Sequence, residues 1–312
     1  MQQAMIVQQQ VLMIFIYVTI GIGCVKKNIL TQESCVSLSR FALVIISPCL
    51  IAGSYIRPYD SQAAKGLLLS FGLAVLYHAI ATLLSVILIP KREDQKHRIE
   101  RMGTIFSNCG YMAIPLINAA VGPSGVFYAV PFISVFTVLL WSEGVILMTD
   151  RERVSWKQMF VNPGFLSFLV GLAIYFLRIP IPSLINQTID SIKALNTPIT
   201  MITVGCFLAG VSLKNILKNR RLYYVGVLRL IVFPMVFLLL LCMMRVSRWL
   251  PCAEEVEWAL LLACACSAPA STTQFPAMYG QDSVYGAQIV AVTVLFSVIT
   301  IPMLTLMAQG LF

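Results

Sequence analysis

The chain of 312 residues is 59% hydrophobic and 11% charged, with a mean hydropathy of +0.86, whereas ordinary soluble proteins are about 25% charged. This composition excludes a soluble globular protein and indicates an all-α polytopic membrane protein without room for a sizeable soluble domain. The net charge of +9 does not indicate nucleic-acid binding, because the basic residues fall in short loops and not on one basic, aromatic-rich face.

Apolar runs of spanning length predict ten transmembrane helices. In chain order they lie at 5–25, 38–56, 66–89, 103–121, 125–148, 160–177, 197–213, 222–244, 256–278 and 284–308. The sixth and seventh runs are short, and the fourth and ninth are interrupted by Pro and small polar residues. The cysteines form no CxxC or His-paired spacing and mostly lie in apolar runs, so we expect small buried side chains and no metal site.

The distribution of Lys and Arg predicts the orientation. Fifteen of them follow odd-numbered helices and six follow even-numbered ones. Because basic residues concentrate on the cytoplasmic side, the richer side is predicted to be cytoplasmic. Both termini are then expected outside, in a multi-pass protein of the plasma (inner) membrane.

An internal repeat links the two halves of the chain. The stretch PCLIAGS at 48–54 matches GCFLAGV at 205–211, and positions 122–129 match 280–287 at nearly the same offset. A repeat of five helices has an odd number of crossings, so the second copy is expected to be inverted in the membrane. We predict a first repeat at 1–149, a short cytoplasmic link at 150–159 and a second repeat at 160–312.

The interrupted fourth and ninth spans occupy corresponding places in the two repeats. The fourth contains NCGYMAIPL at 108–116, where Pro115 removes a backbone donor and clashes with the carbonyl of Tyr111. Lipid cannot satisfy such a break. We therefore expect both spans to break near the midplane and cross, so that their half-helix ends line an anion site. The alternative is that the prolines only kink packed helices.

The substrate site is predicted from the polar residues at these breaks. Asn108 leads the set, because its amide both donates and accepts. The counterpart in the ninth span is CSAPASTTQFP at 266–276. The predicted substrate-binding residues are Asn108, Pro115, Pro269, Ser271, Thr272, Thr273 and Gln274, with Ser107 and Ser267 as further candidates.

Four ionisable residues within or beside the spans are weighed as functional groups. His78 is a candidate proton relay or a hydrogen-bonded packing residue, and Glu143 either pairs with a basic residue or takes part in ion coupling. Arg229 is expected to snorkel towards the cytoplasmic interface. Asp282 is expected to cap the tenth helix, in an outer-half turn.

Two segments carry a resemblance to a known family. SNCGYMAIPLINAAVGPSGVFYA, at 107–129, resembles the fourth-to-fifth-span signature of the auxin efflux carrier family, and SAPASTTQFPAMYGQDSVYGAQIVAVTVLFSVITIPM resembles its C-terminal end. The resemblance implies a PIN-like fold, with a scaffold of the first, second, sixth and seventh spans and an elevator-type transport domain. It also implies organic anions as substrates, auxin or malate-like carboxylates, and a homodimer. The short link is similar to that of bacterial-type members.

The predicted function is a secondary carrier of small organic anions. The chain holds no GxxxxGK[ST] motif for ATP, and no HExxH or GxSxG that would indicate an enzyme. No cofactor is expected, apart from a proton or sodium as coupling ion. The alternatives are a sodium-coupled importer of the bile-acid type, which shares the span count and crossed helices, and a membrane ligand sensor that does not transport.

Overall fold

The computed structural model describes residues 2–149, 162–211, 216 and 218–311, and every regular element in these ranges is a helix. The predicted link at 150–159 lies outside them. In the first half the helices are α1 (Gln2–Lys26), α2 (Gln32–Phe41), η1 (Ala42–Ile46), α3 (Ser47–Gly53), α4 (Ser61–Leu88), α5 (Lys96–Ile105), η2 (Cys109–Ala113), α6 (Ile114–Ala120), α7 (Pro123–Leu139), η3 (Leu140–Gly144) and α8 (Val145–Met148). In the second half they are α10 (Pro163–Phe176), α11 (Ser183–Ala194), α12 (Asn196–Leu208), α14 (Arg220–Val227), η5 (Leu228–Val232), α15 (Phe233–Met244), η6 (Val246–Arg248), α16 (Ala253–Ala265), α17 (Ser271–Met278) and α18 (Ser283–Ala308).

Seven helical stretches of the described chain are long and apolar enough to cross a membrane. They are Met5–Lys26, Glu33–Gly53, Ser61–Leu88, Pro123–Met148, Ser183–Leu208, Arg220–Met244 and Ser283–Ala308. A shorter apolar helix is α10, and the predicted fourth and ninth spans are each divided, into α5 with η2 and α6, and into α16 with α17. The protein is therefore a polytopic helical membrane protein. The count of ten spans and the inverted repeat stay predictions.

The seventh span begins earlier than predicted. The sequence predicts a start near 197, whereas helix begins at Ser183 with α11 and continues, after Leu195, into α12. α11 mixes Leu and Ile with Ser, Asn, Gln, Asp and Lys, so it does not stand out as an apolar run in the sequence. It packs against α3, where a Cβ on Gly53 would lie 2.7 Å from Cγ2 of Ile189.

Three prolines lie inside continuous helices directly after π-turns. Pro48, Pro115 and Pro234 each come two residues after a π-turn, η1, η2 and η5 respectively. Proline lacks an N–H and its ring clashes with the carbonyl one α-helical turn back. A turn with one additional residue moves that carbonyl away, so the helix continues through the proline. The sequence suggested that Pro115 breaks the fourth span. The helix instead continues through Pro115, and the break lies before it, between Ile105 and Cys109.

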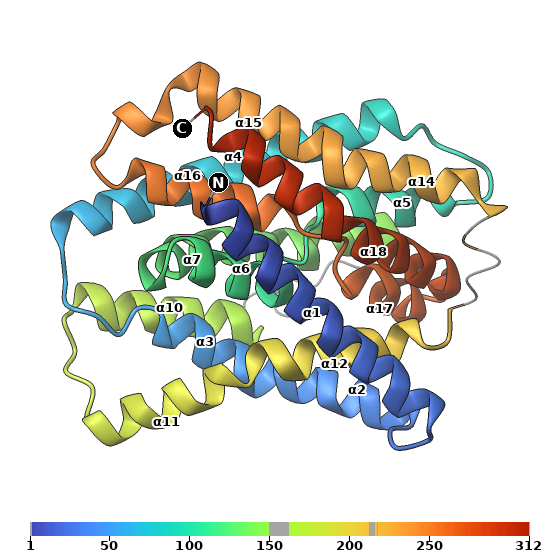
Figure 1. Ribbon diagram of the computed structural model, residues 1–312, viewed down its shortest axis with the longest axis horizontal. Coiled ribbons are helices and arrows are strands. Elements are labelled where there is room, and N and C mark those ends of the chain that lie inside the picture. Colours follow the sequence, from blue (N-terminus) through green and yellow to red (C-terminus); the bar gives the residue numbers. More distant parts are fainter. Residues whose placement is uncertain (1, 150–161, 212–215, 217, 312) are drawn as a thin grey trace.

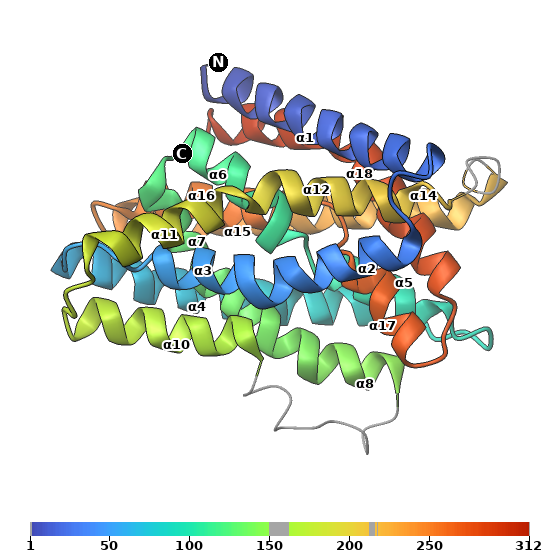
Figure 2. The ribbon, with the colours of Figure 1, turned by 90° about the horizontal axis from the view of Figure 1, so that it is seen from below.

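Helix α1 lies across α12 and α18 on one face of the molecule (Figure 1, Figure 2). The approach of α1 to α12 is close because glycines stand at the contact. A Cβ on Gly21 would lie 2.0 Å from the carbonyl oxygen of Ile202, and one on Gly205 would lie 2.0 Å from that of Val18. Small residues let membrane helices pack backbone to backbone. The divided segments lie deeper, where α16 packs on α7 and α17 on α18.

Candidate functional site

The breaks of the fourth and ninth spans meet. Helix α5 ends at Ile105 and η2 begins at Cys109, while α16 ends at Ala265 and α17 begins at Ser271. Between these helices the N–H of Asn108 donates to the carbonyl oxygen of Ser267 over 2.9 Å. Asn108 also begins the following helix, since its carbonyl accepts from Met112 at 3.0 Å and Ala113 at 3.3 Å. The predicted interruption of both spans is confirmed, and the two breaks are in direct contact.

Buried hydrogen bonds satisfy the backbone at the breaks. Arg229 is fully buried, and its Nε donates to the carbonyl of Cys266 at 3.0 Å. Its Nη1 donates to the carbonyl of Thr104 at 3.0 Å and to the hydroxyl of Tyr77 at 2.8 Å, and its Nη2 donates to the carbonyl of Cys264. The prediction that Arg229 snorkels to the interface is therefore wrong, because unpaired carbonyls at depth bind the guanidinium more favourably than a long reach to the surface would.

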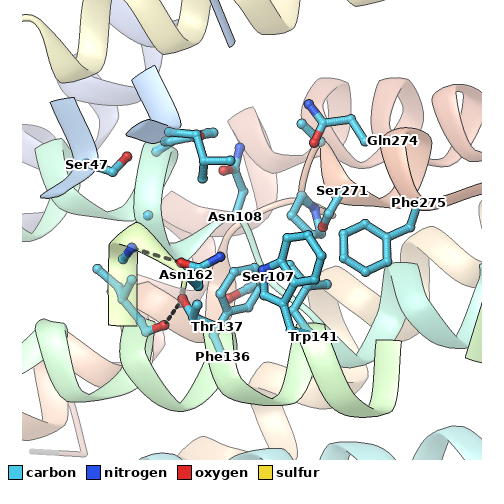
Figure 3. Close-up of a pocket in the computed structure, with 18 of the residues that line it drawn as sticks. Ser47, Ser107, Asn108, Phe136, Thr137, Trp141, Asn162, Ser271, Gln274 and Phe275 are labelled. Carbon is cyan, nitrogen blue, oxygen red and sulfur yellow. Dashed lines mark hydrogen bonds between the residues drawn. The ribbon is translucent and has the colours of Figure 1, made fainter. Parts of the chain in front are cut away.

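A cavity of about 210 Å³ lies beside the crossing (Figure 3). Its walls come from η1 and α3, from the break at 107–111, from α7 and η3, from the start of α10, and from α17. Polar groups in the walls are Ser47, Ser107, Asn108, Thr137, Asn162, Ser271 and Gln274. Most of the remaining lining is apolar and includes the rings of Tyr111, Phe136, Trp141 and Phe275. The site is thus an apolar chamber with a few neutral polar groups.

Two hydroxyl groups of this cavity have no hydrogen-bond partner in the described chain. Ser107 is fully buried and Ser271 is 8% exposed, and the hydroxyl oxygen of neither is paired. Ser271 is the first residue of α17, and no side chain caps that helix. The amide of Asn108, 4% exposed, likewise forms no hydrogen bond with a described side chain or backbone group. Buried polar groups are normally paired. The three unpaired groups at this cavity could therefore find their partners in a bound solute or in water.

Four of the predicted substrate-binding residues line the cavity: Asn108, Pro269, Ser271 and Gln274. Thr272 is fully buried on the opposite side of α17, where a Cβ on Gly286 of α18 would lie 2.1 Å from its carbonyl oxygen. Thr273 is half-buried outside the cavity. Pro115 lines a second cavity, of about 760 Å³, together with Asn118, Arg57 and Lys193.

The two candidates for proton or ion coupling are not among the residues that line either cavity. His78 is fully buried among aromatic rings, with Nδ1 2.8 Å from the carbonyl oxygen of Ala74 in its own helix. Glu143, in η3, accepts a hydrogen bond from Thr82 at 3.0 Å. Each therefore has a local partner within or beside α4. Their roles in coupling stay predictions.

Asn162 is a cavity-lining residue that the sequence analysis did not single out. It lies near the start of the predicted sixth span, and its side chain accepts from the N–H of Gly164 at 2.8 Å and begins α10 at the cavity wall. The signal was present, because Asn followed by Pro and Gly is typical of a helix start. Thr137 and Trp141 were also missed, since nothing in an apolar run distinguishes the side that faces a cavity.

A charged cluster joins the ends of α5, α14 and α18. The buried carboxylate of Glu100 accepts from Arg221 at 2.9–3.1 Å, from Arg92 at 3.1 Å and from the hydroxyl of Tyr285 at 2.8 Å. Asp282 accepts from the N–H of Tyr285 at 2.9 Å, which confirms the predicted cap. Its carboxylate lies 3.8 Å from Nζ of Lys96. Asp282 therefore lies on the same side of the molecule as Lys96, which is the side that the basic residues predict to be cytoplasmic.

Comparison with protein families identifies the chain. A family model described as membrane transport protein matches residues 6–154 and 151–305, which together cover nearly the whole sequence. No curated protein matches the chain significantly. The matched family is a transporter family and agrees with the apolar helices and with the divided segments that meet in the structure. The chain belongs to the membrane transport protein family, which is the auxin efflux carrier, or PIN-like, family.

Proposed function

We propose that the protein is a secondary carrier that moves small organic anions across the plasma membrane. The observation that carries this proposal is the cavity at the contact between the two divided segments, with the free amide of Asn108 in its wall. Irregular backbone is tolerated at membrane depth where it lines a cavity. Transporters place substrates at such breaks, and the N-terminal ends of half-helices attract anions there.

The lining favours an acid with one carboxylate and an apolar body. No Lys or Arg is found among the described residues that line the cavity, so an anion would be held by neutral donors and helix ends. The rings of Trp141 and Phe275, with centroids 5.3 Å apart, offer a wall for a flat apolar group. A dicarboxylate such as malate would leave its second charge facing this wall. An aromatic monocarboxylate therefore fits the cavity better.

The second cavity supports alternating access. Both cavities are lined in part by Leu50, and between them the amide of Asn196 donates to the carbonyl of Gly110 over 3.4 Å. The second cavity is lined by Arg57 and Lys193, which follow even-numbered spans and so lie on the predicted outer side. In the proposed ten-span inverted repeat, an elevator-type movement of the crossed segments would carry the anion from one cavity to the other.

The membrane potential can drive such export. With the inside negative, moving one negative charge outward gains about 2.3 kcal/mol per 100 mV. Efflux therefore needs no coupling ion, whereas import against this potential would need one.

The test is flux through purified protein in liposomes. We would impose an inside-negative potential and measure currents and radiolabelled efflux of indole-3-acetate, benzoate and malate. Asn108→Ala should abolish the flux, and Asn186→Ala, in α11 and not among the residues that line either cavity, should leave it unchanged. Monodisperse elution and an unchanged melting temperature would establish that the variants fold.

Three results would contradict the proposal. Flux that requires sodium would favour an importer of the bile-acid type. Saturable binding without any flux would favour a sensor. Equal loss of flux in both variants would remove the crossing site from the mechanism.

A further inference from the structure

The buried charge of Arg229 lies at the C-terminal ends of both half-helices. Thr104 is in the last turn of α5 and Cys264 is in the last turn of α16. Cys266 is the first residue after the end of α16. Their carbonyl oxygens and the hydroxyl of Tyr77 accept four hydrogen bonds from the guanidinium, which has five donors. Arg229 thus binds two converging helix ends that carry partial negative charge.

No carboxylate of the described chain forms an ion pair with Arg229. Its charge is balanced only by neutral dipoles, of which two helix C-termini supply roughly half a negative charge each. A buried charge without an acid partner is costly. A neutral Gln could donate to two of these four acceptors without placing a full positive charge at this depth.

In transporters with divided helices, the C-terminal half-helix ends and unwound carbonyls coordinate the coupling cation. Here a guanidinium occupies that position. We propose that the guanidinium of Arg229 permanently takes the place of a coupling cation. Its charge makes the crossing selective for anions and makes anion binding independent of sodium. The inference rests on the proposed function and deepens it.

The charge can act on the site through two hydrogen bonds and the peptide link between Cys266 and Ser267. Cys266, which accepts from Arg229, is adjacent to Ser267, whose carbonyl accepts from the N–H of Asn108. Arg229, Cys266 and Ser267 are fully buried, and the low dielectric of a buried region strengthens the interaction between charges. Arg229 does not line the cavity. It is therefore a positioning residue that acts through the crossing and its field.

The experiment separates charge from structure by comparing two ligands of the same shape. Equilibrium binding of tritiated indole-3-acetate and of its neutral analogue indole-3-acetamide would be measured on purified protein in sodium-free choline buffer. The proteins are wild type, Arg229→Lys, Arg229→Gln and, as a matched control, Arg248→Gln in the exposed η6 turn. Wild type would also be measured in sodium.

We expect wild type and Arg248→Gln to prefer the anion equally with and without sodium. Arg229→Lys should retain that preference. Arg229→Gln should lose at least tenfold in affinity for the anion and less than threefold for the amide. Equal losses for both ligands would reduce Arg229 to a structural cap and overturn the inference.

An affinity of wild type that rises tenfold with sodium would also overturn it, because the cation position would then be open. If Arg229→Gln does not fold, Arg229→Lys and the comparison with sodium test the inference instead. Loss of the preference for the anion in a folded Arg229→Lys variant overturns it. A sodium-independent wild type with a selective Lys variant supports it. Absence of binding and of flux for every acid in wild type would instead contradict the proposed function itself.

Discussion

The N–H of Asn108 donates to the carbonyl oxygen of Ser267 over 2.9 Å, and this bond joins segments from opposite halves of the chain. It fixes the backbone of Asn108 and leaves the side-chain amide at the cavity wall. The same contact supports Ser271, four residues beyond Ser267, at the start of α17. This backbone hydrogen bond, together with those of Arg229, therefore fixes the two breaks relative to one another beside the proposed anion site.

Asn108→Asp tests the sign of the charge at this wall. The substitution keeps the size of the side chain but replaces the amide donor with a carboxylate. Because like charges repel, we expect the affinity for indole-3-acetate to fall at least tenfold, about 1.4 kcal/mol. Equilibrium binding at pH 7.5 measures it, with Asn186→Asp as control. Unchanged binding would exclude Asn108 from the site.

Ser271→Ala tests the free hydroxyl at the start of α17. A hydrogen bond to a solute contributes about 0.5–1.5 kcal/mol, so we expect affinity for the acid to fall roughly three- to tenfold. Since this hydroxyl has no hydrogen-bond partner in the described chain, the melting temperature should not fall. Thr272→Val, on the other side of the helix, should leave affinity unchanged. A larger effect of Thr272→Val would contradict the observed orientation of α17.

Trp141→Ala tests the aromatic wall. Loss of the indole removes apolar contact area from the cavity, so affinity for indole-3-acetate should fall about tenfold or more. Affinity for malate, which has no apolar body, should change much less. Competition binding with both acids on one preparation gives the ratio. A ratio that stays constant would contradict the preference for an apolar acid.

Gly205→Ala tests the contact between α1 and α12. A Cβ there would lie 2.0 Å from the carbonyl oxygen of Val18, a rigid backbone atom. We expect destabilisation by about 1–3 kcal/mol or more, seen as a lower melting temperature and less monodisperse protein. Gly23→Ala is the control, because a Cβ at Gly23 meets no atom within 4 Å. Equal stability of the two variants would refute the close approach of these helices.

His97 gives a pH dependence outside the spans. Burial, together with Arg101 and Arg98, lowers the pKa of His97, and its Nδ1 accepts from the N–H of Arg92 at 3.2 Å. The unfolded chain binds this proton as pH falls through about 6.5 while the native chain resists it, so stability is lost towards low pH. The melting temperature should fall from pH 7.5 to 5.5, and less so in His97→Gln. An identical pH dependence in both proteins would exclude this role.

The sequence predicted where the spans divide but not what divides them. Small polar residues beside Pro115 and Pro269 indicated both breaks, because Asn and Ser are unusual within an apolar span and are tolerated where the helix is interrupted. Pro115 itself is accommodated by a π-turn, and a turn type cannot be derived from residue identities. Arg229 was misplaced for a related reason. Its partners are carbonyls from distant segments, which exist only once both helices have ended.

The site was predicted in composition but not in orientation. Asn108, Pro269, Ser271 and Gln274 reach the cavity, whereas Thr272 and Thr273 do not, because the packing of α17 on α18 decides which side is free. Asn162 and Trp141 come from segments without a polar cluster. Their contribution follows from tertiary contacts alone.

The π-turns before Pro48, Pro115 and Pro234 set the rotational register of their helices. One additional residue turns everything beyond it by about 100° relative to an uninterrupted helix. Deleting one residue within Leu228–Val232 would therefore rotate the helix on one side of the turn relative to the other side. Either Arg229 or Pro234 would then lose its alignment with the surrounding helices, even if the deleted residue makes no important contact itself. In these helices the number of residues is as strict a constraint as their identity. A one-residue deletion should destabilise the protein more than a substitution at any position of the same turn other than Arg229.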